Sequence, residues 1–125
     1  MKKFFLLLLL TIPSFNVGLI SSAYSQTTES AKGMAMCDRI QKQAICEEYR
    51  LSTLTSADKK IIERHCTSDA LCPEQNRVAR CLKFKDPDDV VFDKHYYRDV
   101  TDKEEWQPGY IEETCTNNNG KYIAD

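Results

Sequence analysis

The sequence is poor in the short motifs that accompany enzyme chemistry. It has only four glycines in 125 residues, and none of them forms a glycine-rich loop of the kind that holds phosphate groups. It has no G-x-S-x-G segment, and no serine or cysteine stands in a recognisable arrangement with a base. No two cysteines are spaced C-x-x-C, which argues against a thioredoxin-like redox centre and against a zinc knuckle. We therefore expect no enzyme, no catalytic residue and no cofactor.

The sequence also lacks an apolar run long enough to span a membrane. The run at residues 4–10 is interrupted from Pro13 onward, whereas a spanning helix needs about 20 mostly apolar residues. Two lysines precede the run, and residues 23–25 carry small side chains at the positions that a signal peptidase reads. Residues 1–25 are therefore predicted to be a signal peptide that is cut before Gln26. The mature protein is expected in the periplasm or outside the cell, without membrane insertion.

Neither sign of charge dominates the chain. The 17 basic and 19 acidic residues give a net charge of −2, which becomes −4 when the two leader lysines are removed. Because the signs are interspersed and the excess is acidic, we do not expect a nucleic acid as partner. The remaining 100 residues suffice for one small domain, which we place at residues 34–125 after a flexible polar lead-in at 26–33.

Six cysteines, all downstream of the leader, are the most informative residues that are present: Cys37, Cys46, Cys66, Cys72, Cys81 and Cys115. An even number in a small exported domain predicts three disulfides, with fifteen possible pairings. Each such bond contributes about 2–5 kcal/mol, which matters in a domain with a small core.

From residue 34 onward the chain repeats one order of signals. The first half contains Cys37, the pair Tyr49-Arg50, and Cys66; the second contains Cys81, the pair Tyr97-Arg98, and Cys115. The last cysteine follows the arginine by 16 positions in the first half and by 17 in the second. This pattern predicts a duplicated strand–helix unit. It also predicts the pairings Cys37–Cys66, Cys81–Cys115 and, by what remains, Cys46–Cys72.

Local signals place several elements. Thr55 and Asp58 form an N-terminal cap for a helix that ends at Cys66. Residues 77–84 and 90–97 are predicted to be a β-hairpin closed by the turn 85–89. Thr101 and Glu104 begin a short helical piece, and a new helix runs from Pro108 to about residue 116, where three asparagines and a glycine end it.

For residues 34–50 the sequence is compatible with two secondary structures. Residues 34–40 and 44–50 form either a hairpin or one helix, since Met36, Ile40 and Ala44 are four residues apart. The duplication favours the hairpin. The predicted fold class is therefore α+β, a disulfide-stapled domain of two similar hairpin-plus-helix halves.

Few side chains suggest chemistry. His65 and His95 are the only histidines, and no spacing brings further metal ligands to either. The acidic residues of segment 86–93 have neither the glycine nor the closing glutamate of a calcium loop. Met34 and Met36 beside Cys37 are residue types that suit copper(I), but we expect them to pack. No metal site is predicted.

The aromatic residues around the second hairpin are the best candidates for a binding surface, namely Tyr96, Tyr97, Trp106 and Tyr110. We expect a non-catalytic binding module for a protein partner in the cell envelope or a host. One alternative is an inhibitor that presents loop 85–89 to a protease or toxin. Another is a metal-binding or redox protein that uses His65, His95 and Met36.

The order of these signals resembles that of small, secreted, cysteine-rich bacterial proteins without an assigned activity. The resemblance rests on segments spread over most of the mature chain: 46–49 (CEEY), Cys66, Cys72-Pro73, 77–81 (RVARC), Tyr96-Tyr97, Cys115 and 119–122 (NGKY). It implies a secreted domain and no catalytic residue.

Overall fold

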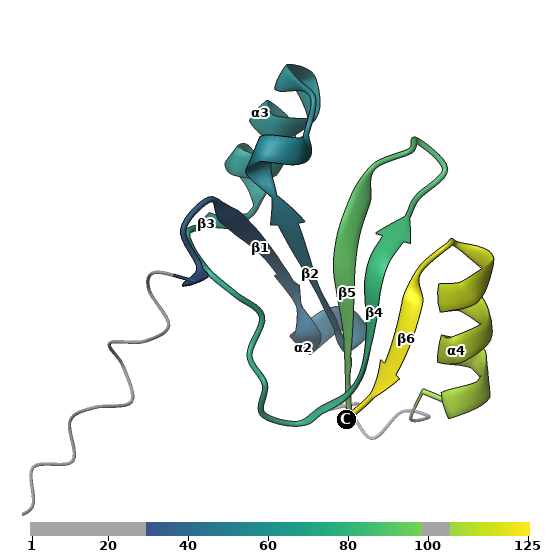
Figure 1. Ribbon diagram of the computed structural model, residues 1–125. Coiled ribbons are helices and arrows are strands. Elements are labelled where there is room, and N and C mark those ends of the chain that lie inside the picture. The colour runs from purple at the N-terminus through teal and green to yellow at the C-terminus, as the bar shows by residue number, and fades with distance from the viewer. Residues whose placement is uncertain (1–29, 99–105) are drawn as a thin grey trace, which may run out of the picture.

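The computed structural model describes residues 30–98 and 106–125, which form an α+β domain (Figure 1). Its six-stranded sheet is antiparallel throughout and has the order β3-β1-β2-β5-β4-β6. The strands are β1 (Met34–Arg39), β2 (Ile45–Arg50), β3 (Thr67–Ser68), β4 (Arg77–Lys85), β5 (Val91–Tyr97) and β6 (Lys121–Ala124). The helical elements are α2 (Ile40–Gln43), η1 (Leu51–Thr53), α3 (Ser56–His65) and α4 (Pro108–Asn117). The predicted fold class is confirmed.

The duplication is present in three dimensions. The first unit is β1-β2-α3-β3 and the second is β4-β5-α4-β6, and the two meet where β2 pairs with β5. From that seam outward, both halves of the sheet have the same strand order. Equivalent pairs face each other in the two units: Ala35 with Tyr49 and Cys37 with Glu47 in the first, Ala79 with Tyr96 and Cys81 with Lys94 in the second. The domain is therefore a pseudo-two-fold arrangement of two ββαβ units.

This register corrects one detail of the sequence comparison. Tyr49 corresponds to Tyr96, so the two Tyr-Arg pairs that suggested the repeat are offset by one residue. Neighbouring residues of a strand point to opposite faces, and an offset of one therefore exchanges an inward side chain for one on the other face. The third strand of each unit, β3 or β6, was not predicted.

The three predicted disulfides, Cys37–Cys66, Cys46–Cys72 and Cys81–Cys115, are all present. Directly paired residues share one face of the sheet, so the register places Cys37 and Cys81 on the same face. Both helices α3 and α4 are thus tied to this face, which we call the helix face. It carries the main hydrophobic core, including Tyr49, Phe92 and Ile111.

The opposite side of the sheet, the second face, carries a smaller core of Cys46, Cys72 and Tyr97. The connection 69–76 between the two units is bound to it. Cys72 forms the disulfide with Cys46, and the Tyr97 hydroxyl donates a 2.6 Å hydrogen bond to the carbonyl of Pro73. The connection therefore links the two units over the seam of the sheet.

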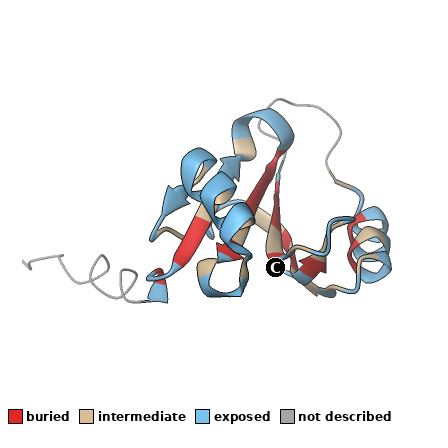
Figure 2. Ribbon diagram, turned by 90° about the horizontal axis from the view of Figure 1, so that it is seen from above, coloured by how far each residue is buried: buried red, intermediate tan, exposed pale blue. Residues whose placement is uncertain are grey.

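The two long helices differ in how they pack. Helix α4 begins at Pro108 as predicted and buries Ile111 and Cys115. Helix α3 has the predicted Thr55 cap, but none of its residues is buried, and Figure 2 shows it without the buried colour that α4 carries. In Figure 1, α3 projects beyond the end of the sheet.

The open question in the first half is resolved in favour of the hairpin. β1 and β2 are joined by the single turn α2, and Ala44 ends that turn in the left-handed conformation with φ 53°. The packed chain begins earlier than predicted, since Ala31 is buried and Gly33 accepts a hydrogen bond from Leu51. The predicted helical piece at Thr101 lies outside the described residues. No helix in the described ranges has the length and apolar character needed to cross a membrane.

Candidate functional site

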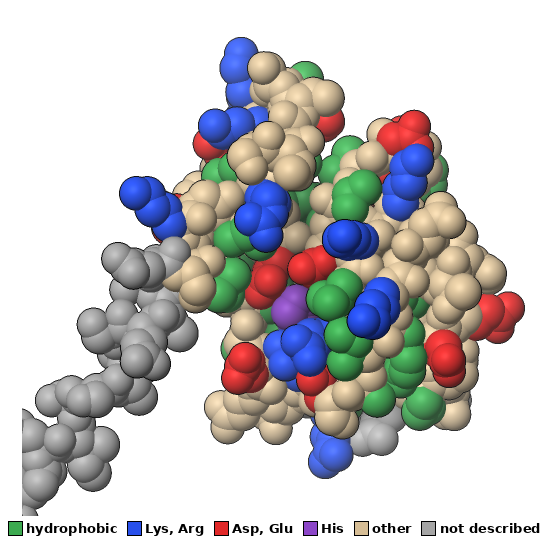
Figure 3. All heavy atoms as spheres, in the orientation of Figure 1, with side chains coloured by type: hydrophobic (Ala, Val, Ile, Leu, Met, Phe, Trp, Pro, Cys, Tyr) green, Lys and Arg blue, Asp and Glu red, His purple; other side chains and the backbone are tan. Residues whose placement is uncertain are grey.

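Charged side chains gather on the second face over β2 and β5, around a histidine (Figure 3). His95 is buried, with Nε2 3.5 Å from Glu48 Oε2 and Nδ1 3.4 Å from Arg77 Nη1. Arg77 continues the row by binding both carboxylate oxygens of Asp125, with 3.2 Å between Nη2 and Oδ1. Residues from β2, β4, β5 and the end of the chain thus meet in one cluster around the buried His95.

The donors and acceptors of this cluster define the form of the imidazole. A guanidinium can only donate, so Nδ1 of His95 accepts from Arg77. In the neutral ring the proton then lies on Nε2 and points toward Glu48. The other carboxylate oxygen, Glu48 Oε1, accepts a 2.6 Å hydrogen bond from the Cys72 N–H. The cluster therefore fastens the connection 69–76 to the sheet.

A metal ion does not fit these groups. The possible ligand atoms of Glu48, Cys72 and His95 lie within 4.8 Å of one another. The sulfur of Cys72, however, is in a disulfide and is no thiolate, and Nε2 of His95 carries the proton. Arg77 also places a positive charge beside the ring. What remains is a single carboxylate, which is too small a ligand set.

The pKa values of two carboxyl groups in the cluster are lowered. Burial by itself would raise the pKa of Glu48, but the contact with His95, the Cys72 amide and the Arg77 charge outweigh it and lower that pKa. The hydrogen bond from Arg77 lowers the pKa of the Asp125 side chain, and the charge of Arg80 adds to the effect. In their ionised form, both side chains therefore stabilise the folded state.

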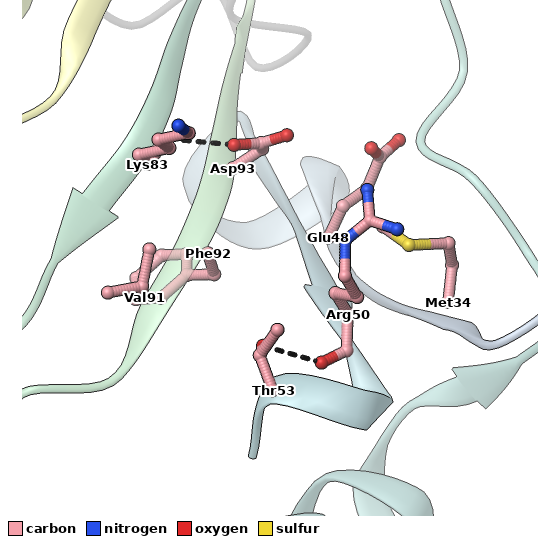
Figure 4. A pocket seen from close by; sticks show the side chains of 8 residues that line it. All are labelled: Met34, Glu48, Arg50, Thr53, Lys83, Val91, Phe92 and Asp93. Atoms are coloured by element: carbon pink, nitrogen blue, oxygen red, sulfur yellow. Dashed lines mark hydrogen bonds between the residues drawn. The ribbon is translucent and has the colours of Figure 1, made fainter.

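A groove of about 200 Å³ opens beside this cluster (Figure 4). Figure 4 shows Met34, Glu48 and Arg50 on one side and Lys83, Val91 and Asp93 on the other, with Thr53 at one end and Phe92 beside Val91.

The two carboxylates of the groove are engaged within the protein, Glu48 as described and Asp93 as the acceptor of a 2.8 Å bond from the Lys83 N–H. The cations are not. Among the described residues, no carboxylate lies within 4 Å of the side-chain nitrogens of Arg50 or Lys83.

Lys83 owes its position to an irregularity of β4. The register of the β4–β5 pair shifts between Cys81 and Phe84, and Lys83 has φ 58°. A β-bulge of this kind redirects the side chain of the extra residue. The bulge is therefore what turns this lysine toward the groove.

The predicted aromatic surface is wrong for two of its four residues. Tyr96 and Tyr97 are only 2% and 1% exposed, because one packs in the main core and the other in the small core beneath the connection 69–76. Trp106 is half-buried and Tyr110 is 56% exposed, with their rings stacked 5.9 Å apart. Only these two remain at the surface.

The remaining sequence candidates do not converge. His65 is exposed at the end of α3, whereas His95 is buried on the second face. Met36 packs on the second face, while Cys37 points to the helix face. The turn 85–89 is closed by Asp86 Oδ1, which accepts 2.9 Å bonds from the N–H groups of residues 88 and 90.

Sequence reasoning named His95 and Met34 as candidate ligands but did not identify the cluster and the groove to which they belong. Glu48 and Arg77 stand in no motif that suggests a site, and only the β2–β5 and β4–β5 registers bring them to His95. The one available signal was strand alternation, which places residues 93, 95 and 97 on one face. No family model, curated protein or solved structure matches this chain.

Proposed function

We propose that this protein is an exported, non-catalytic binding module that holds a protein partner in the groove of the second face. Export is supported by the leader-like N-terminus and by three disulfides, which form and persist in oxidising compartments. The partner belongs to the cell envelope or to a host.

The observation that carries the proposal is a pair of cations at the groove that no carboxylate of residues 30–98 or 106–125 neutralises. Arg50 and Lys83 are exposed on its two sides, while the carboxylates between them are already hydrogen-bonded. Val91 adds an exposed apolar side chain at the same place. Arginine next to apolar surface is typical of protein interfaces, where the cation pairs with the partner and the apolar group is covered.

A non-catalytic role agrees with the chemistry of the cluster. His95 is buried, and both of its nitrogens face charged groups of the protein. A general base needs a free lone pair that reaches a substrate. Here the lone pair of Nδ1 faces Arg77, so we assign the cluster to holding the connection 69–76.

The inhibitor alternative is not favoured by the geometry of its loop. The turn 85–89 is short and closed by Asp86, and an ion pair of 2.8 Å joins Lys85 to Asp89. Such a turn offers no extended segment that a protease could align in its cleft.

Site-specific photocrosslinking in the producing cells tests the proposal. We expect a crosslinkable residue at position 91 to give a defined adduct, and a residue at the exposed position 112 of α4 to give none. The double change Arg50→Glu and Lys83→Glu should abolish the adduct, while the intact mass still shows three disulfides. An adduct that forms from position 112 alone, or that survives the double change, would rule out the groove.

A further inference from the structure

Helix α3 has the same position in the order of elements of the first unit as α4 has in the second. Each helix follows a hairpin and leads to a disulfide with that hairpin's first strand, Cys37–Cys66 or Cys81–Cys115. Helix α4 buries Ile111 and Cys115 over β4 and β6. Helix α3 buries none of its ten residues, although it comes from the same kind of unit.

Burial of an apolar face does not by itself explain why α3 is a helix. A helix of ten residues is marginal in water by itself. Three local features hold it in place: the Asp58 N–H donates to Thr55 Oγ1 at 3.2 Å, Ile62 rests half-buried on the core, and the disulfide of Cys66 fixes the end. The rest of its surface faces outward on a rigid support.

The outward side of α3 is cationic around an apolar centre. Ile61 is 56% exposed, and Lys60 and Arg64 flank it one turn apart. Within the described residues neither cation has a carboxylate within 4 Å, whereas the neighbouring Lys59 pairs with Glu63 at 3.8 Å. Like charges at positions i and i+4 destabilise a helix. An anionic partner would remove that repulsion.

We propose that α3 is a docking helix for an acidic segment of a partner protein. Carboxylates of the segment pair with Lys60 and Arg64, and one of its apolar side chains covers Ile61. A protein segment fits better than a nucleic acid, because a phosphate backbone offers no apolar group to cover Ile61. The acidic excess of the whole chain also disfavours a nucleic acid. The α3 residues do not line the groove, so this surface is separate from the proposed function.

Short fluorescent peptides of one apolar pattern, with glutamate, glutamine or lysine at the other positions, test the proposal on the oxidised mature protein. By fluorescence anisotropy at low salt, we expect the glutamate peptide to bind about tenfold more tightly than the glutamine peptide, and salt to remove this difference. The double change Lys60→Glu and Arg64→Glu should abolish the preference, and Ile61→Ser should weaken binding of both peptides.

Matched variants separate this surface from general charge effects. Lys42→Glu with Lys121→Glu reverses two exposed cations away from α3 and should leave the preference intact. Arg50→Glu with Lys83→Glu should also leave it intact; if it removes the preference instead, the attraction belongs to the groove and the proposal for α3 is wrong. Equal binding of the glutamate and glutamine peptides would also overturn it, as would displacement of the peptide by a single-stranded oligonucleotide.

Discussion

Gly120 offers the sharpest test of the packing described above. It lies between α4 and β6, beside the Cys81–Cys115 disulfide, and its N–H donates to the Cys115 carbonyl at 2.9 Å. A Cβ at this position would lie 2.8 Å from Cys115 Sγ and closer still to Cys81 Sγ. The glycine is thus required for space rather than for a left-handed turn, since Asn119 with φ 58° makes that turn.

The cost of Gly120→Ala follows from what would have to move. Both sulfurs are fully buried and covalently fixed, so neither can move aside like the end of a flexible side chain. Overpacking of a core costs about 1–3 kcal/mol, and this site belongs at the upper end of that range. We therefore expect a loss of about 3 kcal/mol, a large part of the roughly 5–15 kcal/mol that stabilises a domain.

Urea unfolding of the oxidised protein measures this loss, and the other described glycines are the controls. No atom lies within 4 Å of a Cβ built at Gly109, so Gly109→Ala in α4 should be neutral or stabilising by up to about 1 kcal/mol. Gly33→Ala should cost about 1 kcal/mol through its φ of +77° alone. The reasoning is refuted if Gly120→Ala unfolds within about 0.5 kcal/mol of the unchanged protein while its three disulfides are intact.

Three further predictions concern the cluster, the core and the connection 69–76. Because the pKa values of Glu48 and Asp125 are lowered on folding, their contribution is present above about pH 4 and is lost as the pH falls through the folded values. Thermal melts at decreasing pH should therefore show a smaller loss of stability for Glu48→Gln than for the unchanged protein. An equal loss would contradict the stabilising role assigned to the Glu48 carboxylate. Burial raises the pKa of three core tyrosines, Tyr49, Tyr96 and Tyr97, and that of Tyr96 rises to about 12. The folded state therefore loses stability as the pH rises above the ordinary pKa of tyrosine, and these three side chains should ionise only as the protein unfolds. If the tyrosinate absorbance of these three residues rises before the circular dichroism is lost, this prediction is wrong. Replacing Cys46 and Cys72 together by alanine should cost about 3 kcal/mol in urea unfolding, and an unchanged midpoint would show that the connection is held without the bond.

The elements predicted correctly depend on neighbouring residues. The Thr55 cap, the start of α4 at Pro108 and the turn 85–89 each depend on a few adjacent side chains and backbone groups. The disulfide pairings are a longer-range result, and they followed from the repeat, because a duplicated unit repeats its internal bonds. For these features the order of residues along the chain contains enough information.

The features that were missed depend on register. Tyr96 and Tyr97 are adjacent and chemically identical, yet they lie in different cores on opposite faces of the sheet. Strand β6 has only four residues, and it becomes a strand by pairing with β4. A segment this short has little preference of its own, so the partner strand determines its structure.

The sequence by itself determined a small α+β domain, its leader-like start, its three staples and its repeated plan, because composition, cysteine order and local caps are read directly from the chain. Only the tertiary structure decided that Glu48, His95, Arg77 and Asp125 form one cluster and that Arg50 and Lys83 face one groove. It also decided that α4 buries Ile111 and Cys115 while α3 buries none of its residues. The residues of the cluster and the groove come from several strands and from the end of the chain. Their meeting depends on how the strands align across the sheet, and a shift of one residue in that alignment would send each side chain to the other face.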